Sequence, residues 1–274
     1  MKFPFYWIDA FADRVFAGNP AGVVPLAAWP DDALMQRMAF EHGLSETAFF
    51  VPAKPPSEAS AKAGRFHLRW FTPTVEVALC GHATLAAAHV LFHELGERGD
   101  VVTFDTRSGP LTVARQTDGK LQLDFPATPP QVVDDASRVP DVARALGGAE
   151  VVWLGRSKFD WFAQLCDAAA VRALRPDFTR VAALGARGLI VTAAGDDCDF
   201  VSRFFAPQSG VAEDPVTGSA HSALAPFWAE QLGRAELHAR QVSARGGELW
   251  CAVTGDRVLI AGHSRLYLRG EVSA

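Results

Sequence analysis

The sequence predicts an α+β protein of two pseudo-symmetric lobes, each a curved, mostly antiparallel sheet wrapped around a central apolar helix. Three observations lead to this fold class. Two similar segments lie half a chain apart, and the first of them predicts a helix that is apolar on every side. Most of the remaining chain has the pattern of short strands separated by Gly, Pro and Asp-Gly.

The internal repeat is centred on Gly81 and Gly218, which lie 137 positions apart in a chain of 274 residues. Cys-Gly-His-Ala-Thr-Leu-Ala at 80–86 aligns with Thr-Gly-Ser-Ala-His-Ser-Ala at 217–223. This pair and two flanking pairs of similar segments occur in the same order in each half of the chain. They predict two lobes with equivalent helix starts, which can face each other across one cleft. The flanking echoes are 69–73 with 203–207, 107–111 with 245–249, and the Leu-Gly pairs 95–96 with 232–233.

Runs rich in β-branched and aromatic residues predict many short strands, and turn residues punctuate them at intervals typical of antiparallel sheet. We expect strands at 5–11, 22–26, 46–51, 65–71, 101–106, 111–115, 120–125, 150–154, 161–165, 188–192, 199–205, 237–242, 248–253 and 256–261.

Helices are few. Amphipathic patterns predict them at 31–41, 140–146 and 171–174. Residues 83–91 carry only Thr84 and His89 as polar side chains, so this helix must be buried on every side. Its repeat contains Pro226 about two turns in. An interior proline costs about 3 kcal/mol, so we expect the helix to break there.

The repeat and the proline distribution predict the domain organisation. The N-terminal lobe covers 1–125, and the C-terminal strand 264–274 can join it; the C-terminal lobe covers 126–263. The proline-rich stretch 126–140 is the expected junction, and 52–64 is an expected polar loop.

Composition and charge argue against several kinds of binding partner. The net charge is −5 and no two Lys or Arg residues are adjacent, which argues against nucleic acid. No apolar stretch approaches the roughly 20 residues of a membrane span, and the start of the chain has no signal-peptide pattern. The four cysteines are widely separated, which predicts a reduced, cytoplasmic setting and argues against a thiolate zinc site.

Glu46 is the candidate general base. It follows a predicted helix stop and precedes an apolar strand, where partial desolvation would raise its pKa toward neutrality. A plain surface carboxylate is the alternative.

Cys80, Gly81 and His82 open the apolar helix, whose first N–H groups and dipole suit a substrate carboxylate. A tight turn with a capping side chain and a buried filler is the structural alternative.

Asp214, Gly218 and Ser219 open the repeated helix. A turn acid and an N-cap serine are the alternatives here. A functional role is favoured because the two helix starts occupy equivalent positions of the repeat and would converge by pseudo-symmetry. His89 and His93 have the spacing of a zinc pair, but no Glu completes the motif, so packed histidines are favoured.

Five motifs in order resemble the PhzF-like phenazine biosynthesis family, over essentially the whole chain. They are Asp-Ala-Phe at 9–11 with Gly-Asn-Pro-Ala-Gly at 18–22, Leu-Ser-Glu-Thr-Ala-Phe at 44–49, Arg-Trp-Phe-Thr-Pro at 69–73, the 80–86 segment, and Glu-Asp-Pro-Val-Thr-Gly-Ser-Ala at 213–220.

This resemblance implies a diaminopimelate epimerase-like fold with the active site between two lobes. It implies that Glu46 is the acid/base and that His82, Asp214 and Ser219 are active-site residues. It further implies no metal or organic cofactor and a homodimer. Two-thiol epimerases of this fold carry one cysteine per lobe, but the repeat partner of Cys80 is Thr217.

We therefore expect a cofactor-independent isomerase that moves a proton on a small carboxylic acid. Glu46 would take the proton and His82 and Asp214 would complete the relay. Ser219, with backbone N–H groups near Gly81 and Gly218, would bind a carboxylate, and Asn19 is a further candidate for substrate contact. The alternatives are an amino-acid racemase or epimerase that uses Cys80, and a catalytically silent small-molecule-binding protein.

Overall fold

A computed structural model describes residues 1–53, 64–133 and 137–274. The expected loop at 52–64 therefore lies almost wholly outside the described residues, as do positions 134–136 of the expected junction. The chain divides into two compact units. The first comprises Met1–Asp124 with Ala261–Ala274, and the second comprises Phe125–Ile260.

The first unit is built on one mixed sheet. Strands β18, β1 and β2 are antiparallel neighbours, β2 and β3 are parallel, β3 and β4 are antiparallel, β4 and β6 are parallel, and β6, β7 and β8 are antiparallel. The bounds are β1 (Lys2–Ala10), β2 (Asn19–Pro25), β3 (Glu46–Pro52), β4 (Gly64–Phe71), β5 (Glu76–Val77), β6 (Val101–Thr106), β7 (Gly109–Arg115), β8 (Leu121–Pro126) and β18 (Ser264–Ser273).

The second unit repeats this order of pairings. Its strands β9, β10 and β11 are antiparallel neighbours, β11 and β12 are parallel, β12 and β13 are antiparallel, β13 and β15 are parallel, and β15 and β16 are antiparallel. The internal repeat in the sequence is therefore a repeat of topology. The bounds are β9 (Gln131–Val132), β10 (Val151–Arg156), β11 (Trp161–Leu165), β12 (Leu189–Ala194), β13 (Phe200–Ala206), β14 (Val211–Asp214), β15 (Glu236–Gln241), β16 (Gly247–Thr254) and β17 (Arg257–Gly262).

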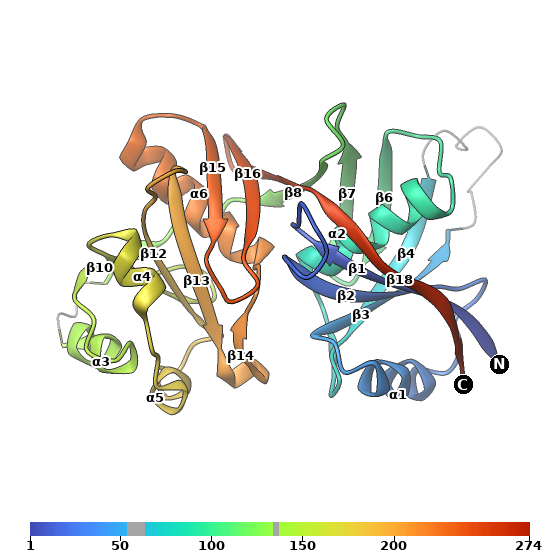
Figure 1. The fold of residues 1–274 in the computed structure, drawn as a ribbon, viewed down its shortest axis with the longest axis horizontal. Coiled ribbons are helices and arrows are strands. Elements are labelled where there is room, and N and C mark those ends of the chain that lie inside the picture. Colours follow the sequence, from blue (N-terminus) through green and yellow to red (C-terminus); the bar gives the residue numbers. More distant parts are fainter. Residues whose placement is uncertain (54–63, 134–136) are drawn as a thin grey trace. The chain divides into compact units, whose positions relative to one another are not determined.

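Each unit holds one of the two repeated helices. All nine residues of α2 (Gly81–His89) are buried, and the helix contacts β1, β2, β3, β7 and β18 (Figure 1). In the second unit, α6 (Gly218–Leu232) packs on β15 and β16. The N-caps of these helices, Cys80 and Thr217, occupy matching positions of the repeat. The predicted α+β class, with an apolar helix inside a mostly antiparallel sheet, is confirmed.

Several further helices complete the two units. Helix α1 (Asp32–His42) is capped by Asp31 and ends at Gly43 in a left-handed conformation, as the sequence predicts. Among the described residues the others are η2, a π-helical turn (Val90–Glu94), α3 (Arg138–Ala145), α4 (Ala168–Ala173), α5 (Phe178–Ala183) and the short η3 (Pro207–Ser209). The sequence patterns anticipate α3 and α4 but not α5.

Helix α6 does not break at Pro226, so that prediction is wrong. Proline removes the N–H that would bond to the carbonyl of Ser222 one turn earlier. Here the N–H of Thr128 donates to the Ser222 carbonyl at 2.9 Å instead. Because the freed acceptor has this replacement donor, the helix continues through the proline to Leu232.

The repeat extends to an ion pair. Arg69 forms two hydrogen bonds to Glu76 across β4 and β5, and Arg203 forms two to Glu213 across β13 and β14. Each guanidinium also lies over a phenylalanine two residues further on, 5.1 Å from the ring centre in the first unit and 4.9 Å in the second. The echo that begins at these arginines thus marks equivalent structures.

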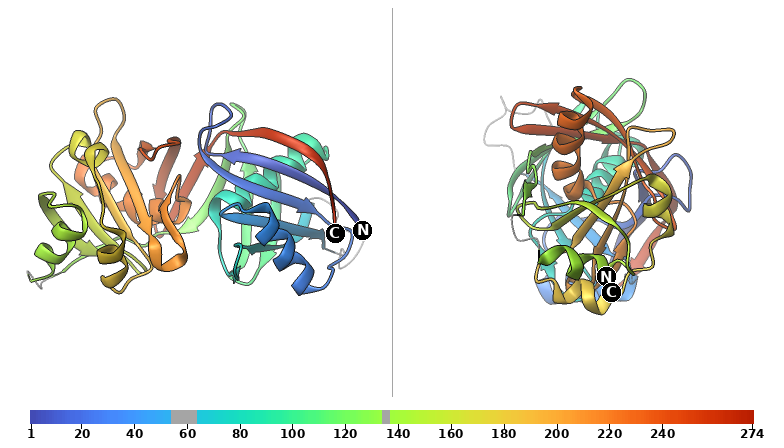
Figure 2. Two further views of the ribbon diagram at one scale, coloured as in Figure 1. Left: turned by 60° about the horizontal axis from the view of Figure 1, so that its bottom comes forward. Right: turned by 90° about the vertical axis from the view of Figure 1, so that its left-hand side faces the viewer.

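The two ends of the chain lie together in the first unit. Strand β18 pairs with β1 over nearly its whole length, and Ala274 N–H donates to the Met1 carbonyl at 2.9 Å (Figure 2). No helix in the described parts of the chain combines the length and the apolar character needed to cross a bilayer.

Candidate active site

Glu46 and His82 lie together in the first unit. Glu46 is the first residue of β3, where the chain emerges from the left-handed turn at Gly43 that ends α1. His82 is the second residue of α2. Glu46 Oε2 is 3.2 Å from His82 Nε2, and the side chains are only 17% and 6% exposed. The carboxylate and the imidazole are thus in close contact at the edge of the core.

Asn19 fixes the other side of the imidazole ring. Its Nδ2 atom lies 3.1 Å from His82 Nδ1. An amide nitrogen only donates, so Nδ1 accepts. Burial lowers the pKa of His82 to about 3, so the ring is neutral above that pH and carries its single proton on Nε2, facing Glu46.

The position of Asn19 depends on the glycine before it. Gly18 has a φ of +66°, and a Cβ there would come within 2.2 Å of the Ala10 carbonyl oxygen. The turn into β2 therefore requires glycine. Asn19 is fully buried, which suits support of His82 better than direct contact with a substrate.

Cys80 completes this cluster. Its Sγ lies 3.5 Å from His82 Nδ1, and its extended backbone leads into α2. Single ligand atoms of Glu46, Cys80 and His82 lie within 4.8 Å of one another, so these are the side chains that could hold a metal ion in the described part of the unit.

Asp214 is the last residue of β14 in the second unit, and hydrogen bonds hold both its side chain and its carbonyl. Its Oδ2 accepts a hydrogen bond of 2.5 Å from Thr217 Oγ1. Gln241, on β15, donates from Nε2 to the Asp214 carbonyl at 2.7 Å and accepts the Thr217 N–H on Oε1 at 2.8 Å. The start of α6 is therefore held by a side chain from a neighbouring strand.

Ser219 is the second residue of α6 and is half-buried. Its Oγ accepts a hydrogen bond of 3.1 Å from Arg187 Nη1. The same guanidinium donates to both carboxylate oxygens of Asp160, whose side chain is 2% exposed. An arginine paired with a buried carboxylate thus reaches the first turn of the repeated helix.

The structure gathers the candidate residues into one cluster in each unit, around the start of each repeated helix. Asn19, Glu46, Cys80, Gly81 and His82 belong to the first unit. Asp214, Gly218 and Ser219 belong to the second.

Sequence reasoning missed Arg187, Asp160 and Gln241. None lies in a recognisable motif. Pairings between distant segments bring them to α6: β11 with β12 for the first two, and β13 with β15 for Gln241. A single sequence carries no signal for such pairings.

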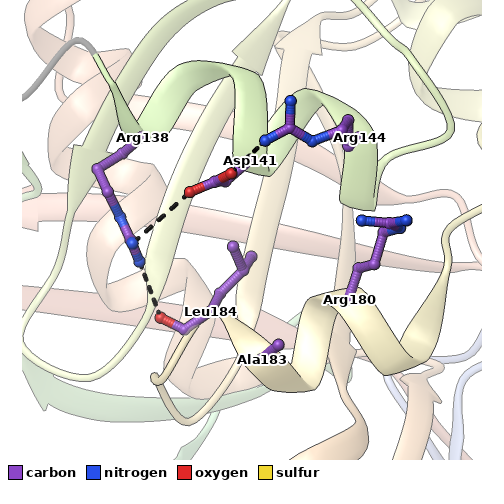
Figure 3. A pocket seen from close by; sticks show the side chains of 6 residues that line it. All are labelled: Arg138, Asp141, Arg144, Arg180, Ala183 and Leu184. Atoms are coloured by element: carbon purple, nitrogen blue, oxygen red, sulfur yellow. Dashed lines mark hydrogen bonds and ion pairs between the residues drawn. The ribbon is translucent and has the colours of Figure 1, made fainter.

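A separate surface pocket of about 220 Å³ lies between α3 and α5 in the second unit (Figure 3). Asp141 there pairs with Arg138 at 3.7 Å and with Arg144 at 2.5 Å, and Arg138 also donates to the Leu184 carbonyl. The lining residues include none of the predicted site residues, so the pocket is distinct from the candidate cluster of this unit.

Known proteins resemble the chain over its whole length. The model of the family described as phenazine biosynthesis-like protein, PhzC-PhzF, matches residues 8–270. An "uncharacterized isomerase" of Pseudomonas aeruginosa is 53% identical over 272 residues, which is 99% of each chain. The crystal structure of a phenazine biosynthesis protein of the PhzF family from Enterococcus faecalis is 42% identical, covers all of both chains and superposes with a TM-score of 0.92.

The fold alone extends further. A hydroxyproline epimerase from Agrobacterium vitis shares it at 12% identity and a TM-score of 0.60, over 99% of this chain and 92% of that one. The sequence-based resemblance and fold class are thus confirmed. The chain belongs to the PhzC-PhzF family of phenazine biosynthesis-like proteins, and with relatives of that family it is classed as an isomerase.

Proposed function

We propose that this isomerase moves a proton on a small carboxylic acid, with Glu46 as general base and without a cofactor. The observation that carries the proposal is the contact of 3.2 Å between Glu46 Oε2 and His82 Nε2, at side chains that are mostly but not fully removed from water. A base that accepts a proton from carbon needs this combination of access to substrate and partial desolvation.

In the proposed reaction a C–H bond beside an activating group breaks. Its proton goes to the Glu46 carboxylate, and the electron pair enters the adjacent π system. The Nε2 atom of neutral His82 lies 3.2 Å from Glu46 Oε2, so its N–H dipole supports this oxygen and leaves the other for the substrate. Return of the proton to a different carbon completes an isomerisation with no net change in oxidation state.

Asp214 and Ser219 supply the second part of the proposal. Ser219 and the first N–H groups of α6 suit a carboxylate, because helix N-termini favour negative charge. Gly81, at the start of α2, offers the same kind of donor in the first unit. Asp214 would add an acid/base group. That Asp214 acts on the same substrate as Glu46 stays a prediction, and activity loss in both Glu46→Gln and Asp214→Asn would support it.

The test is uptake of solvent deuterium. A panel of small cyclic and unsaturated carboxylic acids is incubated with the protein in D₂O and followed by proton NMR. We expect at least one acid to take up deuterium, and Glu46→Gln to slow uptake by about 10²-fold or more without loss of folding. Glu41→Gln, at an exposed residue near the end of α1, is the matched control. Full activity of Glu46→Gln would end the assignment.

A racemase or epimerase remains the second candidate because Cys80 Sγ lies 3.5 Å from His82 Nδ1. Inversion of a chiral amino acid that is lost in Cys80→Ser and kept in Glu46→Gln would favour it. An acid that protects the protein against unfolding but gains no deuterium would favour a silent binding protein. The homodimer and the cytoplasmic location also stay predictions, the first of them testable by light scattering.

A further inference from the structure

Ser219 is held in a specific hydrogen-bonding state. A hydroxyl has one hydrogen to donate and two lone pairs that accept. Arg187 Nη1 donates to Ser219 Oγ at 3.1 Å, which occupies one lone pair with a cationic donor. The hydroxyl hydrogen must then point away from the guanidinium, and donation from a cation polarises the hydroxyl into a better donor.

The guanidinium itself cannot swing. Its Nε and Nη2 atoms donate to the two carboxylate oxygens of Asp160 at 2.9 and 2.5 Å, a forked geometry that fixes the plane of the group. Phe159 and Phe204 lie beside it, with ring centres 5.3 and 5.4 Å from the guanidinium carbon. Arg187 therefore has one orientation, in which the remaining arm reaches Ser219.

Backbone contacts hold Arg187 in this orientation. The Arg187 N–H donates to the Phe159 carbonyl at 3.1 Å, and the Gly188 carbonyl accepts from the Trp161 N–H at 2.9 Å. A Cβ on Gly188 would come within 2.5 Å of the Phe204 ring. Only glycine allows this phenylalanine to lie against the arginine.

The charge of Arg187 is matched by that of Asp160, which is buried at its side. The pair is close to neutral as a unit, so it is poorly suited to attract an anion by charge alone. What the Arg187–Asp160 pair does in the structure is orient the Ser219 hydroxyl. A buried carboxylate destabilises the fold unless it is well paired. Here the arginine that pairs with Asp160 also donates to the start of α6.

We propose that Arg187 is a positioning residue that holds the Ser219 hydroxyl as a hydrogen-bond donor to the carboxylate of the substrate. This rests on the proposed role of Ser219 and adds the residue that sets its direction. The chemical class selected is an acid with an ionised carboxylate, in preference to its neutral primary amide, because a carboxylate oxygen accepts more strongly.

The first test needs no substrate. Crystal structures of the wild type and of Arg187→Met are compared at the Ser219 side chain, with Arg156→Met as the matched control. Arg156 also lies over an aromatic ring and donates to a backbone carbonyl, but it does not contact Ser219. We expect one Ser219 rotamer in the wild type and the control, and a changed or divided rotamer in Arg187→Met. An unchanged rotamer would overturn the proposal.

The second test is kinetic and uses the acid found by the deuterium screen, together with its primary amide. Arg187→Met should raise KM for the acid by about 10-fold with kcat nearly unchanged, and reduce the preference for acid over amide. In a Ser219→Ala background the same change should raise KM less than 2-fold, because the contact that it acts through is gone. An equal effect in both backgrounds would overturn the proposal.

Arg187→Met leaves Asp160 buried without its partner, so the variant is also made with Asp160→Asn to preserve folding. The outcomes separate the two proposals. A moved Ser219 rotamer with no change of KM in Ser219→Ala would refute carboxylate binding by Ser219 and leave the orienting contact intact. An unmoved rotamer with a large effect of Ser219→Ala would refute only the role of Arg187.

Discussion

His82 presents its Nε2 atom to Glu46 Oε2 at 3.2 Å while its Nδ1 atom faces the amide nitrogen of Asn19 at 3.1 Å. The two contacts give the ring a direction. Asn19 donates, so Nδ1 accepts, and the single proton of the neutral ring is on Nε2, the nitrogen nearer the carboxylate. Asn19, which is buried and distant from Glu46 in sequence, therefore determines that the protonated nitrogen of His82 is the one that faces the Glu46 carboxylate.

The first prediction exchanges this donor for an acceptor. Asn19→Asp places a carboxylate at Nδ1, which favours a protonated ring between two acids. We expect the pKa of His82 to rise from about 3 and deuterium uptake to slow at least 10-fold, because Glu46 then faces an imidazolium that weakens it as a base. The ¹⁵N shifts of the His82 side chain report both protonation and tautomer.

Asn19→Leu is the control for this prediction. It removes the donor without adding charge, so the ring should stay neutral and divide its proton between the two nitrogens. Identical ¹⁵N spectra of His82 in the wild type and Asn19→Asp would contradict the account of the tautomer.

Local patterns were enough to predict much of this protein. The apolar run around α2 implies burial on every side, and Gly43 and Asp31 mark the ends of α1 through their own backbone and capping chemistry. The repeat predicts two equivalent helix starts, because small residues recur at one spacing around Gly81 and Gly218 and allow similar packing. These features depend on residues within a few turns of each other.

Features that depend on long-range pairing could not be predicted in this way. Arg187 lies beside Asp160 because the strands that follow them, β11 and β12, pair, and Gln241 lies on β15, which pairs with β13. No local sequence pattern indicates either of these positions.

The second prediction concerns pH and a buried histidine. His221 donates from Nδ1 to the Thr217 carbonyl at 2.8 Å, and its Nε2 has no hydrogen-bond partner among the described residues. Burial lowers its pKa to about 4. As the pH falls below about 6.5, the unfolded chain takes up a proton before the folded one does, so stability is lost between 6.5 and about 4.

At pH 5 this histidine alone should account for a loss of about 2 kcal/mol relative to pH 8. Urea unfolding at the two pH values measures the loss. In His221→Phe, which keeps an aromatic ring beside Phe200 and cannot titrate, the difference between pH 8 and pH 5 should be smaller by about that amount. An equal loss in both proteins would exclude His221 as the cause.

The third prediction compares a buried and an exposed arginine. Arg203 is 10% exposed at its side chain, pairs with Glu213, and donates to the carbonyls of Val171 and Leu174. Arg203→Met leaves all three acceptors without this donor, and we expect a loss of about 3 kcal/mol in the free energy of unfolding.

Arg144→Met is the matched change at the surface. Arg144 pairs with Asp141, but its side chain is 58% exposed, so the loss should stay within about 0.5 kcal/mol. Equal losses for the two variants, measured by urea unfolding, would contradict the assignment of the Arg203 pair to the structural core of the repeat.

The fourth prediction tests why α6 passes through Pro226. Thr128→Pro removes the N–H that bonds to the Ser222 carbonyl at 2.9 Å, in a region where Ser222 is 5% exposed. An unsatisfied buried carbonyl costs about 1 to 3 kcal/mol, so this variant should lose stability by that amount. In a Pro226→Ala background the helix regains its own N–H at this position, which can bond to the same carbonyl, and the effect of Thr128→Pro should fall below about 1 kcal/mol. The four proteins of this cycle are compared by urea unfolding. If Thr128→Pro costs the same with and without the proline, the Thr128 contact is not what lets the helix continue.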